Sequence, residues 1–311
     1  MYRIGVDIGG MSIKVGLVNE NGEIIQQCRK VTASTPSECI SNLIDQINYL
    51  IETNNLTIKD VMGIGIGCPG SVLPTKGIVD FLPNLGWNNV PLVDILTKTF
   101  NLPIKLANDA SVATLAEAKY GVAKDYESCV MFTLGTGVGG GVVIDNKLYD
   151  GFNGRGGELG HIILDLNGEP CTCGRRGCVE TFVSASALIR QTKKAMCEDE
   201  SSSMWEYAGG IEGVDGKTAF ECAKSGDKTA LKVVDNYCVY LAESIMSLLN
   251  IFRPEVFILG GGISLQGEYL LKKVIDHCEK KEYGYKGAPK TKIVCASLGN
   301  DAGIIGAAAL I

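Results

Sequence analysis

Four residues between positions 161 and 178 have the chemistry of a metal site. His161, Cys171, Cys173 and Cys178 supply one imidazole nitrogen and three thiolates. This set fills the tetrahedral coordination of Zn²⁺ and leaves no position open for water, which is typical of a structural zinc. The pattern therefore predicts a structural zinc site, and the alternative is a group of ordinary reduced cysteines.

Two carboxylates flank this segment, which we call the zinc loop (residues 158–180). Glu158 precedes His161 by three residues, and Glu180 follows Cys178 by two. Because a closed zinc site offers no open coordination position, the metal itself should do no chemistry. We expect the zinc to fix the two acids and the imidazole relative to each other, so that the chemistry lies beside the metal.

A glycine-rich turn near the N-terminus has groups suited to a phosphate. The segment 4–22 reads as strand, glycine turn, strand and a closing hairpin. Backbone amides at glycines can approach an anion closely, polar side chains add donors, and a carboxylate at the end of the first strand can hold Mg²⁺ or its water shell. The residues concerned are Gly9, Gly10, Ser12, Lys14 and Asp7. A tight hairpin without a ligand is the alternative.

A second glycine turn repeats this plan around Gly135, Thr136 and Gly137, with apolar strands on both sides. The repeat suggests a duplicated domain in which each half offers backbone amides to one phosphate chain. The spacing fits neither a Walker loop nor the dinucleotide fingerprint, which requires a helix after the glycines. Farther along, Gly261 and Gly262 follow a predicted strand, where a flat ring could lie against bare backbone.

Asp109 is the candidate general base. A strand over 104–107 runs into Asn108 and Asp109, and an alanine-rich helix then continues to Tyr120. The positive end of the helix dipole favours the ionised form of a carboxylate in the first turn. The alternative is an aspartate that only caps the helix. In the loop before this region, Asn84 and Trp87 either suit a hydroxyl-rich ligand or represent turn chemistry and a packed aromatic ring.

Composition limits the classes of function. The chain has 311 residues and a net charge of −6, which argues against a nucleic-acid surface. No apolar run is long enough to span a membrane, and the N-terminus enters a strand directly, so we expect a cytoplasmic protein. Further elements expected are a helix capped by Thr35, a long helix over Thr229–Asn250 with Leu231 on its apolar stripe, and a final helix, capped by Asn300 and Asp301, that packs on the first domain.

These motifs together resemble the ROK family of sugar kinases and repressors, and within it the bacterial glucokinases. The resemblance runs from residue 4 to the C-terminus and rests on Asp7–Gly10, Leu134–Gly141, Leu259–Gly262, the zinc loop, Asn84–Trp87 and Leu298–Gly303. It implies an α/β protein with the actin-like ATPase (ribonuclease H-like) fold, in which two α/β lobes surround a cleft. The expected lobes are residues 1–118 plus 300–311, and residues 119–299.

The resemblance also implies an activity, the transfer of a phosphoryl group from ATP, with Mg²⁺, to the 6-hydroxyl of glucose. Asp109 would be the base, and the hexose contacts would be Gly70, Asn84, Asn108, Asp109, Glu158, His161 and Glu180. The alternatives are kinase activity on N-acetylmannosamine or another hexose and, more remotely, a sugar-responsive regulator. Such regulators carry a helix-turn-helix ahead of the kinase-like body, whereas here a strand begins by Ile4. A homodimer or higher homo-oligomer is expected.

Overall fold

The computed structural model describes residues 1–82, 85–281, 283–284, 287 and 289–311. They form two compact units. The first contains Met1–Cys129, Gly141–Gly157 and Ser297–Ile311, and the second contains Val130–Gly140 and Glu158–Ala296. The C-terminal segment Ser297–Ile311 therefore belongs to the same unit as the N-terminal residues. The division differs from the predicted boundaries because residues 119–129, 141–157 and 297–299 are grouped with the first unit.

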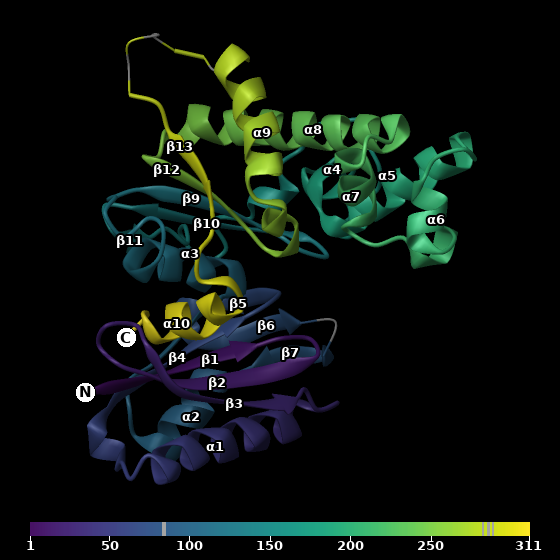
Figure 1. The fold of residues 1–311 in the computed structure, drawn as a ribbon. Helices are drawn as coiled ribbons and strands as arrows, with labels where there is room; N and C mark the ends of the chain where they lie inside the picture. Colours follow the sequence, from purple (N-terminus) through teal and green to yellow (C-terminus); the bar gives the residue numbers. More distant parts are fainter. Residues whose placement is uncertain (83–84, 282, 285–286, 288) are drawn as a thin grey trace. The chain divides into compact units, whose positions relative to one another are not determined.

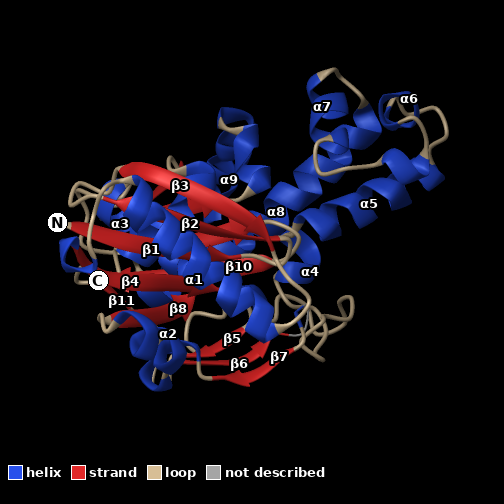
Figure 2. Ribbon diagram, turned by 90° about the horizontal axis from the view of Figure 1, so that it is seen from below, coloured by secondary structure: helices blue, strands red, loops and turns tan. Residues whose placement is uncertain are grey.

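The first unit is built on a five-stranded sheet with the order β3-β2-β1-β4-β8. β1 pairs antiparallel with β2 and parallel with β4, and β4 pairs parallel with β8. The strands span Tyr2–Ile8 (β1), Ser12–Val18 (β2), Ile24–Val31 (β3), Val61–Cys68 (β4) and Ile104–Asn108 (β8). A separate sheet of β5 (Ser71–Leu73), β6 (Ile78–Leu82) and β7 (Trp87–Val90) belongs to the same unit and is seen in Figure 2.

One face of the five-stranded sheet carries the branched apolar side chains of alternate strand positions. Ile4, Val6, Ile64 and Ile66 are fully buried there. They form one core with α1 (Pro36–Thr53) and α2 (Leu92–Phe100). The helix α1 begins as predicted, since the hydroxyl of Thr35 accepts a hydrogen bond from the amide of Glu38 at 3.3 Å.

The opposite face is lined with glycines, and this permits close contact with α10 (Ala302–Ala308), which lies along the sheet in Figure 1. A Cβ atom at Gly5 would lie 2.0 Å from the carbonyl oxygen of Ile304, and one at Gly65 would lie 1.7 Å from that of Ala307. The helix therefore packs backbone against backbone, and any larger side chain at these glycines would displace it. It also packs on α3 (Asp109–Tyr120).

Two expectations about the end of the chain were wrong in detail. The final helix ends at Ala308 rather than Ile311. Asp301 lies at its N-terminus but makes no side-chain capping bond. Its carboxylate instead accepts a hydrogen bond from Gln27 Nε2 at 3.4 Å, because the antiparallel strand β3 brings that amide within reach.

A second five-stranded sheet has the order β11-β10-β9-β12-β13. Its strands correspond one by one to β3-β2-β1-β4-β8, and this agreement matches the repeat read from the two glycine turns. β12 pairs parallel with β13, just as β4 pairs parallel with β8 in the first sheet. The strands span Cys129–Leu134 (β9), Val138–Ile144 (β10), Lys147–Leu148 (β11), Val256–Gly260 (β12) and Lys292–Cys295 (β13).

Helices make up most of the second unit. The longest, α8 (Lys228–Phe252), packs against α5, α7 and α9. It covers the predicted helix, but Leu231 is 36% exposed and is not part of its buried stripe. The others span Glu180–Val183 (α4), Ala185–Glu198 (α5), Met204–Ala208 (α6), Thr218–Lys224 (α7) and Glu268–Lys281 (α9). Among the described residues, none of the helices combines the length and the apolar character that crossing a membrane requires.

Asp227 fixes the start of α8. Its Oδ1 accepts a hydrogen bond from the amide of Ala230 at 2.8 Å. Its Oδ2 accepts bonds from Ser202 Oγ, Ser203 N and Ser203 Oγ at 2.6–2.9 Å. Burial opposes ionisation, but the hydrogen bonds from Ala230 and Ser203 outweigh it and lower the pKa of Asp227.

We predict that Asp227→Asn lowers the free energy of unfolding by about 1 kcal/mol at pH 7, because an amide nitrogen would replace an acceptor oxygen. A carboxylate with a lowered folded pKa stabilises above its unfolded pKa and loses this effect as the pH falls through the folded value. The difference from wild type should therefore be constant near neutrality and shrink below about pH 4. Urea titrations at several pH values measure it, with exposed Asp276→Asn as the control. A difference that stays the same at every pH would contradict the assignment.

Candidate active site

Three parallel strands of the first unit end at one edge of the sheet, and the predicted site residues Asp7, Asn108 and Asp109 lie at that edge. Asp7 of β1 pairs with Gly67 of β4, and Cys68 of β4 pairs with Asn108 of β8. Asp109 follows directly. Burial and the nearby carboxylates of Asp109 and Asp7 raise the pKa of the Cys68 thiol, in keeping with this arrangement. In α/β sheets, ligands bind outside this carboxyl edge of the strands.

The capping of α3 falls to Asn108 rather than to Asp109. The Oδ1 atom of Asn108 accepts hydrogen bonds from the amides of Ala110 at 2.9 Å and Ser111 at 3.4 Å. Asp109 is the first residue of the helix, is exposed, and accepts a bond from the Ala110 amide at 2.8 Å. Its carboxylate is therefore not needed as the cap, and the helix N-terminus favours its ionised form.

Asn108 also forms a hydrogen bond with Gly70, another of the predicted sugar contacts. Its Nδ2 donates to the carbonyl oxygen of Gly70 at 3.4 Å. Gly70 has a φ of +74°, and a Cβ atom there would lie 2.6 Å from the carbonyl oxygen of Phe81. Only glycine fits this turn, which holds Gly70 beside the start of α3.

The first glycine turn borders a cavity of about 630 Å³. Asp7, Gly9, Gly10, Ser12 and Lys14 all line it, together with Asn300 and Asp301. Lys14 Nζ lies 3.0 Å from Asp7 Oδ2. The amide of Gly9 donates to the carbonyl of Ser12 at 2.9 Å, so this amide closes the turn. The space beside Gly10 is open. The structure thus gathers all five predicted residues of the first motif.

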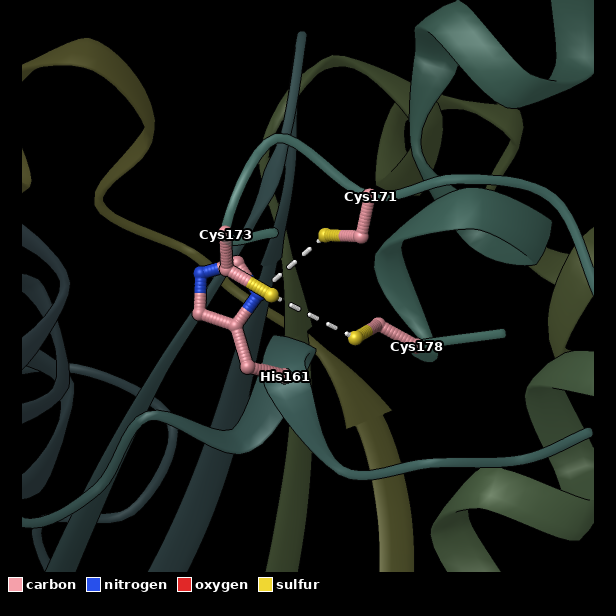
Figure 3. A group of neighbouring side chains, drawn as sticks. All are labelled: His161, Cys171, Cys173 and Cys178. Atoms are coloured by element: carbon pink, nitrogen blue, oxygen red, sulfur yellow. Dashed lines mark hydrogen bonds between the residues drawn. The ribbon is translucent and has the colours of Figure 1, made fainter. Parts of the chain in front are cut away.

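In the second unit, backbone hydrogen bonds fold the zinc loop on itself. The amide of Cys171 donates to the carbonyl of Arg175 at 2.8 Å, and the amide of Gly174 donates to that of Cys171 at 3.0 Å. Gly174 and Gly177 have φ values of +88° and +67°, as the predicted turns require. These turns bring His161 and the three cysteines together, with all four ligand atoms within 4.8 Å of one another (Figure 3).

The separations of these atoms fit a zinc ion. A tetrahedral ion with Zn–S bonds of about 2.3 Å and a Zn–N bond of about 2.0 Å requires S···S edges of about 3.8 Å and S···N edges of about 3.5 Å. Cys173 Sγ and Cys178 Sγ are 3.7 Å apart, and Cys171 Sγ is 3.6 Å from His161 Nδ1. The donor set and its geometry therefore suit Zn²⁺, which when bound would supply a fixed cross-link and a positive charge.

His161 turns Nδ1 toward the sulfurs, and its other ring nitrogen points away from them (Figure 3). Burial and the neighbouring thiols of Cys173 and Cys171 raise the pKa of Cys178 to about 12. Burial alone would raise the pKa of Cys173. The hydrogen bond from the Arg175 amide and the hydrogen bonds with the other two thiols outweigh burial and lower this pKa. The ligands must lose their thiol protons when a metal binds.

Glu180 joins the zinc loop to the second glycine turn. Its Oε2 accepts a hydrogen bond from the amide of Val138 at 3.0 Å. Its Oε1 lies 3.4 Å from Thr172 Oγ1 and 3.6 Å from Cys171 Sγ. A Cβ atom at Gly137 would lie 2.4 Å from Oε2. The link to Val138 could not be predicted from the sequence, since it depends on a contact between residues 42 positions apart in the chain.

The segment that contains Gly261 and Gly262 contacts the same hairpin. A Cβ atom at Gly261, whose φ is +81°, would lie 2.5–2.7 Å from backbone atoms of Leu134. The carbonyl of Gly135 accepts a hydrogen bond from the amide of Ala185 at 2.8 Å. The turn of Gly135, Thr136 and Gly137 therefore has contacts with the segment at Gly261 and with the segment at Ala185. Gly262 begins the short helix that follows Gly261.

Three candidate sugar contacts remain, Asn84, Trp87 and Glu158, and the structure treats each differently. Asn84 lies outside the described residues. Trp87 is only 1% exposed, so it is the packed aromatic ring of the two alternatives. Glu158 is exposed, and its backbone carbonyl accepts a hydrogen bond from the amide of His161 at 3.1 Å.

Comparison with known proteins identifies the family. A family model described as "ROK family" matches residues 3–311. The chain belongs to the ROK family. It is 40% identical to the glucokinase of Thermotoga maritima, over 99% of this chain and 96% of that protein. Its structure resembles that of a ROK family glucokinase from Streptomyces griseus in complex with glucose and AMPPNP, with a TM-score of 0.84, 32% identity, and coverage of 100% and 99% of the two chains. The predicted family and actin-like ATPase fold are thus confirmed.

The family also contains proteins of other function. The chain is 32% identical to the xylose repressor of Caldicellulosiruptor bescii, over 90% of this chain and 70% of the repressor. Its structure also resembles Lmo2764 of Listeria monocytogenes, a suggested N-acetylmannosamine kinase, with a TM-score of 0.78, 25% identity, and coverage of 99% and 97% of the two chains. The coverage is more complete for the kinases than for the repressor.

We predict one tightly bound zinc ion per chain, and its loss in Cys173→Ala. Cys173 is exposed, so removing its thiol costs little packing and mainly removes a ligand. Structural zinc contributes about 10–16 kcal/mol in small peptide sites, so the variant should unfold at a clearly lower temperature. Metal analysis and thermal unfolding measure this, with exposed Cys197→Ala as the control. Full thermal stability in metal-free wild-type protein would contradict the prediction.

Proposed function

We propose that this protein transfers the γ-phosphoryl group of ATP to the 6-hydroxyl of glucose. The observation that carries the proposal is the position of Asp109, exposed at the N-terminus of α3 and at the same sheet edge as Asp7. The full-length similarity to glucokinases supports it. Such a position suits a carboxylate that takes a proton from a bound hydroxyl.

In this mechanism Asp109 accepts the proton of the 6-hydroxyl as the oxygen attacks phosphorus. General base catalysis of this kind contributes about 10²- to 10⁴-fold. The carboxylate must be ionised before the reaction, and the amides at the start of α3 favour that form. Because Asn108 caps the helix, the carboxylate of Asp109 is not required for that role.

Phosphoryl transfer otherwise depends on positioning and on neutralising the phosphate charge. Lys14 brings a positive charge to the cavity beside the first glycine turn, and the open side of Gly10 leaves room for an anion. Asp7 is the candidate residue to hold Mg²⁺ or its water shell, and the ion when bound would neutralise phosphate charge. The second glycine turn would offer further amides to the phosphates.

Sugar recognition is assigned to the acids and the imidazole of the zinc loop. A ligating histidine normally donates its second ring nitrogen to an acceptor. With Nδ1 on the metal side, the other nitrogen of His161 is available to a sugar hydroxyl. Glu158 and Glu180 supply acceptors nearby, and the zinc fixes the loop that carries them.

We predict that Asp109→Asn lowers kcat by at least about 100-fold, because the amide cannot accept the hydroxyl proton. The KM for glucose should change by less than about threefold, since the amide still forms hydrogen bonds. Steady-state kinetics with ATP and glucose measure both constants. Asp94→Asn is the matched control, because Asp94 also lies exposed in the first turn of a helix, α2. Turnover within a few-fold of wild type in Asp109→Asn would show that the base lies elsewhere.

We predict glucose as the sugar with the highest kcat/KM, ahead of mannose, fructose and both N-acetylhexosamines. Acceptors that become buried under a bound sugar discriminate strongly, because a missing or inverted hydroxyl leaves a polar group without a partner. Glu180→Gln should raise the KM for glucose about tenfold or more, and that for ATP by less than about threefold, because its oxygen can still accept from the Val138 amide. A panel of sugars assayed with ATP tests the predicted order of substrates. Steady-state kinetics of Glu180→Gln with varied glucose and with varied ATP test the two KM values. A tenfold preference for N-acetylmannosamine would overturn the glucose assignment and leave the sugar-kinase proposal standing.

A further inference from the structure

A buried carboxylate outside the proposed mechanism lies in the last turn of α3. Glu117 has no solvent-exposed surface. Its Oε1 accepts hydrogen bonds from the amides of Ser297 and Leu298, both at 2.8 Å. Its Oε2 accepts bonds from the amide of Val122 at 3.0 Å and from Ser297 Oγ at 3.1 Å. These four neutral donors match the four lone-pair sites of an ionised carboxylate, which acts only as an acceptor.

Three of the four donors come from one short segment far along the chain. Ser297 and Leu298 lead directly into Asn300 and Asp301, which line the cavity of the first glycine turn. In that cavity Lys14 Nζ donates to the carbonyl oxygen of Asn300 at 3.5 Å. A continuous series of contacts therefore runs from Glu117 through the segment 297–298 to the cavity wall. All of these residues belong to the first unit.

The neighbourhood of Glu117 is shaped for this carboxylate. A Cβ atom at Gly121 would lie 1.9 Å from Oε2, so glycine there leaves the space that the carboxylate occupies. A buried charge costs free energy unless hydrogen bonds fully satisfy it. An amide or an apolar side chain at this position would leave one or more of the four donors unsatisfied.

We propose that Glu117 is a positioning residue for the nucleotide phosphates. Its carboxylate holds the segment 297–301 against α3 and so fixes one wall of the cavity that contains Asp7 and Lys14. The inference rests on the proposed function for the identity of the ligand, the phosphate chain of ATP. It assigns Glu117 an effect on nucleotide affinity and none on sugar affinity, although the helix that carries it begins with Asp109.

The test compares variants that differ in how much of this network they keep. Glu117→Ala removes all four bonds. Glu117→Gln keeps one oxygen, which can replace Oε1 and still accept from Ser297 and Leu298. Gly121→Ala keeps the carboxylate but displaces it. Asp227→Asn, at the start of α8 in the second unit, is the control for lost stability without a contact to the cavity.

AMPPNP binding is measured by calorimetry without sugar, and the KM values for ATP and glucose by kinetics. We expect Glu117→Ala to weaken AMPPNP binding about tenfold and to leave the KM for glucose within about twofold. Glu117→Gln should restore binding to within about threefold of wild type, and Asp227→Asn should leave it unchanged. If Glu117→Ala does not fold, Gly121→Ala should show the same selective loss.

Unchanged AMPPNP binding in a folded Glu117→Ala or Gly121→Ala protein would overturn the inference. An equal loss of nucleotide and sugar affinity would also overturn it, because that result indicates a general loss of structure. The proposed function fails separately, if wild-type protein binds AMPPNP but phosphorylates no sugar. A selective effect of Glu117 on AMPPNP binding would still support the inference in that case.

Discussion

The contact between α10 and the glycine face of the first sheet determines where the cavity of the first glycine turn forms. Because Gly5 and Gly65 have no side chains, the helix backbone lies directly on the strands. The helix begins just after Asn300 and Asp301, so the same contact carries these residues to the first glycine turn. Even Asp7 is packed in this way, since a Cβ atom at Gly303 would lie 2.7 Å from its carboxyl carbon. The packing of α10 on the sheet therefore also determines the geometry of the first glycine turn.

In the second unit, a carboxylate and a close backbone contact hold the second glycine turn in place. There the tip of the β9–β10 hairpin is held by Glu180 on one side and by Gly261 on the other. The zinc ligands fix the loop from which Glu180 extends. A metal ion in that site would therefore influence both the imidazole of His161 and the second glycine turn.

The sequence was most informative where function depends on residue type at short range. The zinc ligands and the two glycine turns were predicted because few other roles require those residues at that spacing. Glu117 was not singled out, because a glutamate on a helix normally faces solvent and its partners Ser297 and Leu298 are 180 residues away. The assignment of Asp301 as a helix cap failed for the same reason, since Gln27 on a distant strand binds its carboxylate instead.

We propose that this ROK family protein is a kinase that phosphorylates the 6-hydroxyl of glucose. The most direct measurement is ³¹P and ¹³C nuclear magnetic resonance of the products formed by wild-type protein from glucose, ATP and Mg²⁺. We expect glucose 6-phosphate and ADP in equal amounts, with no inorganic phosphate above the background. ADP with inorganic phosphate and no sugar phosphate, or a phosphate on another hydroxyl of glucose, would contradict it.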